Sequence, residues 1–338
     1  MKALVTGGAG FIGSHLTERL LNLGHEVAVL DLSVASYRNL NHIKENCRLN
    51  HFCMDIGRYN SWETVVKILK TYKIDYIFHL SGMADIVPSI NKPVDYFNAN
   101  VSGTINMLEA ARQAGVYKFV YASSSSVYGI PDLKNIPTSE TTPIDPQYPY
   151  AETKYQGERW VSHYNQVYGL PTISLRLFNV YGPRSRTTGT YGAVLGTFLA
   201  QKINGKPLTV VGDGKQSRDF VFVTDVCDAF IKAADARFSG EIFNVGTGEP
   251  QIILRLAELL GGKVVYLPER PGEPHITCAD ISKIKLMLNW NPTVSFETGV
   301  KIMLDNIDYW KDAPVWTPET IKEATKPWFN FLGRGGKN

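Results

Sequence analysis

The chain has 338 residues, 44% of them hydrophobic and 20% charged, which is typical of a globular protein with one large domain and a lobe, or with two domains. Its formal net charge of +3 is small for this length and argues against nucleic-acid or membrane-surface binding. The absence of a signal stretch, of an apolar run of about 18 residues and of zinc-type cysteine spacing indicates a cytoplasmic protein with no metal site.

The first half of the sequence alternates short β-rich runs with helical stretches, which is typical of a parallel sheet covered by helices. Most of the runs are continuously apolar, as expected for strands that are buried on both faces. The predicted strands are Ala3–Thr6, Glu26–Asp31, Leu49–Cys53, Tyr76–Leu80, Phe119–Ala122 and Thr172–Leu177. The predicted helices are Gly13–Leu23, Ser61–Thr71, Val101–Ala114 and Tyr150–Tyr168. This pattern predicts an α/β fold of the Rossmann type, with a doubly wound parallel sheet.

After about Asn179 the composition changes, because glycine and proline cluster between shorter strands and helices. We expect a smaller C-terminal α/β lobe that lies against the sheet, with a ligand cleft between the two parts. The predicted boundaries are a sheet domain over 1–178, mainly a substrate lobe over 179–312, and a C-terminal segment over 313–338. In that segment aromatic residues between Pro314 and Leu332 predict a helix packed on the body, and Gly333–Asn338 is expected to be disordered.

The segment Thr6–Gly13 follows the first strand and opens the first helix, and it matches G-x-G-x-x-G from Gly8 and G-x-x-G-x-x-G from Gly7. Glycines permit a tight turn here and let the backbone approach a pyrophosphate, which then lies at the helix N-terminus. Asp31 ends the second strand 21 residues after Gly10. A carboxylate at that place accepts hydrogen bonds from a ribose 2′-hydroxyl and repels a 2′-phosphate, which favours NAD over NADP.

Tyr150 and Lys154 stand four residues apart at the start of a predicted helix, so their side chains share one face. The preceding strand delivers Ser123–Ser126 to the same cleft. A phenol has an unperturbed pKa of about 10, and a neighbouring ammonium together with a positive nicotinamide ring favours the phenolate. We therefore expect Tyr150 to act as a base, with Ser124 bonding the reacting hydroxyl.

These features, taken together, resemble the extended short-chain dehydrogenases that modify nucleotide sugars, most closely the UDP-sugar 4-epimerases of the UDP-glucose type. The resemblance runs in family order from residue 1 to about residue 310. The motifs that carry it are Thr6–Gly13, Asp31, Asp55-Ile56, His79-Leu-Ser-Gly82, Asn100, Ser123–Gly129, Tyr150 with Lys154, Asn179–Arg184, Gly212–Asp219, Phe243–Gly246 and Arg270–Glu273.

The resemblance implies that NAD is retained through turnover and that the protein is a homodimer built on the helices near Asn100–Ala114 and Tyr150–Tyr168. It implies that Ser124, Tyr150 and Lys154 are catalytic. The implied cofactor-binding residues are Gly7, Gly10, Phe11, Ile12, Gly13, Asp31, Leu32, Ser33, Asp55, Ile56, Leu80, Ser81, Gly82, Met83, Asn100, Ser123, Tyr150, Lys154 and Phe178. The implied substrate-binding residues are Ser124, Tyr150, Asn179, Arg186, Gln216, Arg218, Arg270, Glu273 and Thr277.

The residues after Ser124 bear on the reaction. Family 4,6-dehydratases carry an Asp-Glu pair there, because loss of water needs a base and an acid. This sequence has Ser125-Ser126, whose hydroxyls cannot do that work at neutral pH. Epimerases need neither group, since the 4-keto sugar turns in the site and is reduced on its other face. The sequence therefore favours a UDP-sugar 4-epimerase; a 4,6-dehydratase and a non-catalytic NAD-binding protein stay open as alternatives.

Two positions bear on the sugar. Thr277 stands where a large aromatic residue restricts some epimerases to sugars without a C2 acetamido group, so we hypothesise that N-acetylhexosamines are accepted. Arg186 matches an arginine that uronate-using relatives direct at the C6 carboxylate, which keeps UDP-glucuronate open, although Asn179 departs from the threonine usual in those relatives. Arg218 and Arg270 are the expected diphosphate cations, because arginine suits phosphate oxygens.

Overall fold

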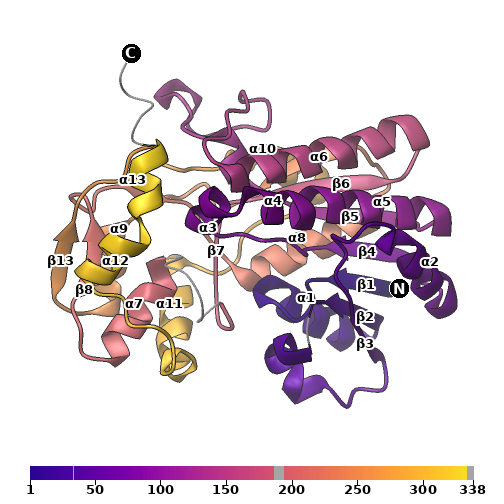
Figure 1. Cartoon of the computed structure of the whole chain (residues 1–338), viewed down its shortest axis with the longest axis horizontal. Helices are drawn as coiled ribbons and strands as arrows, with labels where there is room; N and C mark the ends of the chain where they lie inside the picture. Colours follow the sequence, from indigo (N-terminus) through magenta and orange to yellow (C-terminus); the bar gives the residue numbers. More distant parts are fainter. Residues whose placement is uncertain (33, 186–193, 333–338) are drawn as a thin grey trace.

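The computed structural model describes residues 1–32, 34–185 and 194–332. A seven-stranded sheet forms its centre, with the order β11-β6-β5-β4-β1-β2-β3 and every neighbouring pair parallel (Figure 1). The strands are β1 (Lys2–Thr6), β2 (Glu26–Asp31), β3 (Leu49–Cys53), β4 (Tyr76–His79), β5 (Lys118–Ser124), β6 (Thr172–Leu177) and β11 (Glu241–Val245). The predicted doubly wound parallel sheet is confirmed.

Helices cover both faces of this sheet, and alternate residues of each strand supply the two cores. In β1, Leu4 packs toward α2, α5 and α6, whereas Ala3 and Val5 pack toward α1 and α8. The helices of the first face are α2 (Ser61–Tyr72), α5 (Gly103–Ala114) and α6 (Pro149–Tyr168), and those of the second are α1 (Phe11–Asn22) and α8 (Val223–Asp235). Burial on both faces explains why most of the strands are continuously apolar, whereas the edge strand β3 is only partly buried.

The predicted helix starts are displaced at two places. The first helix begins at Phe11, two residues earlier than predicted, because the glycine turn closes within Gly7–Gly10. Residues Asn98–Ser102 form a π-helical turn (η2) that leads into α5. Two short helices that the sequence analysis did not predict connect β4 to this turn, α3 (Ile86–Asn91) and α4 (Pro93–Phe97).

The rest of the chain forms a smaller lobe beside the carboxyl ends of the strands, on the left in Figure 1. Three two-stranded pairs build it: β7 (Asn179–Tyr181) with β10 (Phe220–Phe222), β8 (Leu208–Val211) with β13 (Val264–Leu267), and β9 (Ser217–Arg218) with β12 (Gln251–Ile252). Its helices are α7 (Val194–Ile203), α9 (Ile253–Leu260), α10 (Ser282–Leu288), α11 (Phe296–Asp305), α12 (Pro318–Ala324) and α13 (Lys326–Leu332). Across both parts of the molecule the chain also forms 3₁₀ segments, namely η1 (Val34–Ile43), η3 (Ser125–Tyr128), η4 (Leu133–Asn135) and η5 (Ile307–Trp310).

The second half of the chain is shared between lobe and sheet. Strand β11 extends the central sheet beside β6, and α8 packs on α1, although both come after residue 179. The boundaries 1–178, 179–312 and 313–338 therefore stay a prediction of which part of the chain binds the cofactor and which part binds the substrate. The predicted C-terminal helix is two short helices, because Pro327 cannot continue a helix from α12 into α13. The predicted disorder of Gly333–Asn338 lies outside the described residues.

Within the described ranges, no helix is both long and apolar enough to span a membrane. The same ranges contain no group of three or more His, Cys, Asp and Glu side chains placed to hold a metal ion.

Candidate active site

The glycine loop lies at the switch point of the sheet, between the carboxyl ends of β1 and β4. Gly7 has φ +66°, and a Cβ there would lie 2.9 Å from the backbone nitrogen of Ser81, so glycine is required twice over. A Cβ on Gly13 would lie 2.1 Å from the Gly7 carbonyl oxygen. Gly10 precedes α1, Phe11 is its first residue and Gly13 lies in its first turn. Because the two glycines have no side chains, a phosphate can approach the backbone at this helix N-terminus.

Asp31 ends β2 beside this loop. Its carboxylate accepts hydrogen bonds from the backbone N–H of Ala9 at 3.1 Å and of Leu32 at 2.8 Å. Burial raises the pKa of Asp31, and these two bonds oppose the rise. The side chain of Leu32 is exposed, and Ser33 lies outside the described residues.

The remaining predicted cofactor residues surround the loop after β4. The buried Asn100 side chain bonds both backbone groups of Met83, accepting from its N–H at 2.7 Å and donating to its carbonyl at 3.0 Å. The Ser81 N–H donates to the Thr6 hydroxyl at 3.2 Å, which ties Leu80–Met83, including Gly82, to β1. Asp55 and the buried Ile56 follow β3, where Asp55 accepts from the Gly57 N–H at 2.9 Å.

The predicted catalytic residues meet at the carboxyl end of β5. Ser124 ends that strand, and Tyr150 and Lys154 lie in the first turns of α6, which Pro149 opens at its first position. Burial raises the pKa of Tyr150, the Ser124 hydroxyl lowers it, and the negative charge of Asp85 raises it. Ser124 also accepts the Ser126 N–H at 3.2 Å and shares a hydroxyl–hydroxyl bond of 2.8 Å with Ser126.

The spacing of Tyr150 and Lys154 suggests a contact between their side chains, but the Lys154 ammonium lies over the ring of another tyrosine, Tyr121. Its Nζ lies 4.4 Å from the centre of the Tyr121 ring, which is a cation–π distance. Burial lowers the pKa of Lys154 to about 7, and Glu158 one turn further along the helix opposes this. The i, i+4 spacing places Tyr150 and Lys154 on one face of the helix. The direction of the Lys154 amine depends on its packing against Tyr121.

Sequence reasoning did not find the buried pair behind the site. Arg176 on β6 and Glu158 on α6 form an ion pair at 2.6 Å with both side chains almost fully buried. The Ser123 hydroxyl donates to the same carboxylate at 2.6 Å, so this side chain faces the protein interior. A buried pair of this kind is held by its extra hydrogen bonds, and no sequence spacing connects residues on different elements.

Beyond residue 178, the predicted substrate residues that the structure describes lie in the smaller lobe. Asn179 begins β7 and accepts a bond of 3.3 Å from the Thr277 hydroxyl, which itself accepts the Asp219 N–H at 3.1 Å. Phe178 precedes them and is buried. The fully buried Asp219, also missed from the sequence, accepts four bonds from Thr247, Gly248 and Ala279 and so holds this part of the lobe together.

Two arginines share one carboxylate in the lobe. Arg218 and Arg270 lie 3.6 and 3.8 Å from the same Glu273 oxygen, so the group keeps one net positive charge. Burial lowers the pKa of Arg218, and Glu273 opposes this. Gln216 donates to the Val211 carbonyl at 2.8 Å nearby. Arg186 lies outside the described residues, so the structure does not bear on its expected contact with a carboxylate.

These residues fit a bound dinucleotide. The glycine cradle has no room for a Cβ at Gly7 or Gly13, it lies at a helix N-terminus, and a carboxylate ends the next strand. The glycine cradle is thus suited to a nicotinamide dinucleotide, and Arg218 and Arg270 in the lobe are suited to a diphosphate.

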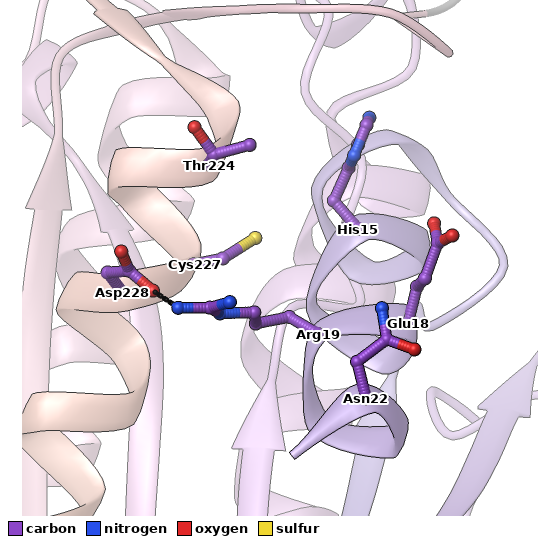
Figure 2. A pocket seen from close by; sticks show the side chains of 7 residues that line it. All are labelled: His15, Glu18, Arg19, Asn22, Thr224, Cys227 and Asp228. Atoms are coloured by element: carbon purple, nitrogen blue, oxygen red, sulfur yellow. Dashed lines mark ion pairs between the residues drawn. The ribbon is translucent and has the colours of Figure 1, made fainter. Parts of the chain in front are cut away.

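Two hollows lie away from the predicted site residues. One, of about 340 Å³, lies between α1 and α8, where Arg19 and Asp228 form an ion pair at 3.3 Å (Figure 2). The other, of about 460 Å³, is lined by Arg38, His42 and Arg184 among others. Neither contains a predicted site residue.

Comparison with known proteins agrees with this arrangement. Residues 3–246 match the family described as NAD dependent epimerase/dehydratase. A UDP-glucose 4-epimerase of Mycolicibacterium smegmatis is 37% identical over 89% of this chain and 96% of its own length.

Two solved structures are similar throughout. The UDP-glucose 4-epimerase of Thermotoga maritima with UDP-glucose has a TM-score of 0.83 and 33% identity, covering 92% of this chain and 99% of its own. The UDP-glucuronic acid 4-epimerase of Bacillus cereus with UDP-glucuronic acid and NAD has a TM-score of 0.83 and 33% identity, covering 91% and 99%. With this coverage in sequence and in structure, the chain belongs to the NAD dependent epimerase/dehydratase family.

Proposed function

We propose that the protein is an NAD-dependent 4-epimerase of UDP-sugars, which interconverts UDP-glucose and UDP-galactose and also accepts N-acetylhexosamines. The observation that carries this proposal is the group of Ser124, Tyr150 and Lys154 at the glycine cradle, followed by two serines in η3 rather than by carboxylic acids. The similarity to the two epimerases solved with UDP-sugars supports it.

Side chains of the protein transfer the proton of the sugar 4-hydroxyl. The Tyr150 phenolate takes the proton from the sugar 4-hydroxyl, and Ser124 holds that hydroxyl in place by a hydrogen bond. When protonated, Lys154, one turn further along α6, adds positive charge that favours the phenolate. NAD, when bound, takes the hydrogen and two electrons from C4 and later returns them.

The steps balance without another reactant. The O–H and C4–H bonds break and a C4=O double bond forms. After the 4-keto sugar has turned, Tyr150 returns its proton to the oxygen and a new C4–H bond forms on the opposite face. The lobe holds the diphosphate through Arg218 and Arg270. Glu273 and Gln216 hold the nucleoside, and Asn179 holds the linkage between the diphosphate and the sugar.

A small panel of nucleotide sugars tests this proposal. The purified protein is incubated with UDP-glucose, UDP-N-acetylglucosamine and UDP-glucuronate, and the products are identified by NMR. We expect the C4 epimer of the first two, with no water lost. A stable 4-keto-6-deoxy product would instead show a dehydratase, and no reaction with any of them would contradict an epimerase. UDP-glucuronate is the second candidate substrate, because the similar Bacillus cereus structure contains it.

Thr277→Tyr tests the width of the sugar site. The larger ring fills the space beside Asn179, so we expect kcat/KM for UDP-N-acetylglucosamine to fall about tenfold or more, with that for UDP-glucose changed less than about threefold. Thr277→Val is the matched control, because it removes the hydroxyl bonded to Asn179 and keeps the size of the side chain. Equal losses for both sugars in Thr277→Tyr would show that Thr277 does not set sugar width.

We further propose a homodimer built on α5 and α6. Trp160 and Tyr168 on α6 and Phe97 on α4 expose large apolar surfaces beside these helices. The molar mass from light scattering should be twice that of the chain. A cytoplasmic location stays a prediction.

A further inference from the structure

The C-terminal helix α13 is a part of the molecule that the proposed reaction leaves without a role. Its three aromatic residues differ in exposure, because Trp328 is buried whereas Phe329 and Phe331 are exposed. In Figure 1, α13 stands beside α3, and the two helices pack against each other. The end of the described chain therefore reaches from the lobe to the helices that follow β4.

Within the lobe, α13 holds the loop that follows β13. This loop forms neither helix nor strand, so its side-chain contacts help to determine where it lies. The Trp328 Nε1 donates to the Pro271 carbonyl at 2.6 Å, and the guanidinium carbon of Arg270 lies 5.6 Å from the centre of the Trp328 ring. A Cβ on Gly272 would lie 3.8 Å from the Cβ of Leu332, so the last residue of α13 lies against the same loop.

The Arg270 guanidinium thus has an aromatic ring and a carboxylate as neighbours. It lies 3.8 Å from Glu273, and its side chain is only 11% exposed. A guanidinium is attracted to the face of an indole ring. A free arginine side chain loses conformational freedom when it binds a phosphate, and one that is already held loses less. The contact with Trp328 should therefore strengthen the binding of a diphosphate by Arg270.

Trp328 also contacts the residue that precedes α6. The rings of Trp328 and Tyr148 have centres 6.3 Å apart. Tyr148 in turn lies beside Tyr150, with ring centres 6.4 Å apart and planes 8° apart. One indole ring is therefore in contact with the loop that carries Arg270 and with the start of the helix that carries Tyr150.

We propose that Trp328 is a positioning residue for the substrate diphosphate: its ring holds the Arg270 guanidinium, its N–H holds the Pro271 carbonyl, and its packing on Tyr148 joins both to the start of α6. This deepens the proposed function and rests on it for the diphosphate as the ligand of Arg270. A tryptophan that only filled the core would stabilise the fold without a particular effect on diphosphate binding.

The test is calorimetry of UDP binding to the full-length, NAD-loaded protein. Trp328→Leu removes the ring and the N–H, and we expect the Kd for UDP to rise about tenfold. Trp328→Phe keeps a ring for Arg270 and removes the N–H, and a rise of about threefold is expected. The content of bound NAD should not change. An unchanged Kd for UDP in Trp328→Leu would overturn the proposal, as would an unchanged Kd in Trp328→Phe should the leucine variant not fold.

Phe331→Leu is the matched control, because Phe331 is an aromatic residue of the same helix that is 61% exposed. It should leave the Kd for UDP unchanged. If it weakened UDP binding as much as Trp328→Leu does, the effect would belong to the helix as a whole and the assignment to Trp328 would be wrong. Thermal unfolding of the same samples establishes that each variant is folded.

A double-mutant cycle with Arg270→Gln shows whether Trp328 acts through that arginine. In the Arg270→Gln background, Trp328→Leu should raise the Kd for UDP by less than about threefold, because the guanidinium that the ring holds is gone. Additive losses would contradict the proposal.

Steady-state kinetics with UDP-glucose supply a second measurement. In Trp328→Leu, KM should rise with the Kd for UDP while kcat falls less than about threefold, and a loss confined to kcat would contradict a role in diphosphate binding. Because UDP binding requires no turnover, the two proposals can fail separately. A protein that binds UDP but converts none of the nucleotide sugars would contradict the epimerase alone, and a wild type that does not bind UDP would contradict the role of Trp328.

Discussion

Tyr150→Phe should lower kcat by about a hundredfold to ten-thousandfold, because the phenol is the only group that we assign as base and acid for the sugar 4-hydroxyl. The ring keeps its packing against Tyr148 and Tyr96, so the fold should persist. KM for the nucleotide sugar should change less than about threefold, since we assign most of the binding to the arginines of the lobe. Initial rates at saturating sugar, measured with the content of bound NAD, decide the outcome.

Tyr164→Phe is the matched control, because Tyr164 lies near the other end of the same helix, where its phenol bonds Glu109 at 3.3 Å. If Tyr150→Phe kept more than about a tenth of the wild-type kcat, proton transfer through Tyr150 would not be the chemistry of this site.

Gly13→Ala should weaken the binding of NAD. The added Cβ would lie 2.1 Å from the Gly7 carbonyl oxygen and 2.8 Å from the Gly8 Cα, and both are backbone atoms that cannot turn aside. The loop must therefore open at the helix N-terminus, and we expect NAD binding to weaken by about 10- to 100-fold. The measurement is the dissociation constant for NAD by calorimetry, with thermal unfolding of the same samples.

Gly115→Ala is the matched control for this loop. Gly115 has a positive φ, +72°, and a Cβ there meets nothing within 4 Å. It should cost about 1 kcal/mol of stability and leave NAD affinity unchanged. If Gly13→Ala bound NAD as the wild type does, the loop would not be the cofactor cradle.

Much of the fold could be predicted from the sequence, because strands buried on both faces are continuous apolar runs. All six strands predicted in the first half are present. Strand β11 was missed since Glu241 and Asn244 interrupt its apolar pattern, and the buried Asn244 side chain donates to the Thr138 carbonyl at 2.8 Å. That bond exists only in the folded chain.

The site was predictable where residues are close in sequence. Tyr150 and Lys154 share a helix face, and the glycine loop follows its strand as expected. The position of the Lys154 amine over Tyr121, and the contact of Trp328 with Tyr148, depend on elements far apart in the chain. No local pattern contains that information.

The central claim is that the hydrogen taken from C4 returns to C4. The direct measurement uses UDP-glucose carrying deuterium at C4, with the product analysed by NMR and mass spectrometry. The account predicts UDP-galactose with the deuterium retained at C4 and none exchanged with water. Deuterium found at C6, or lost to solvent, would contradict it.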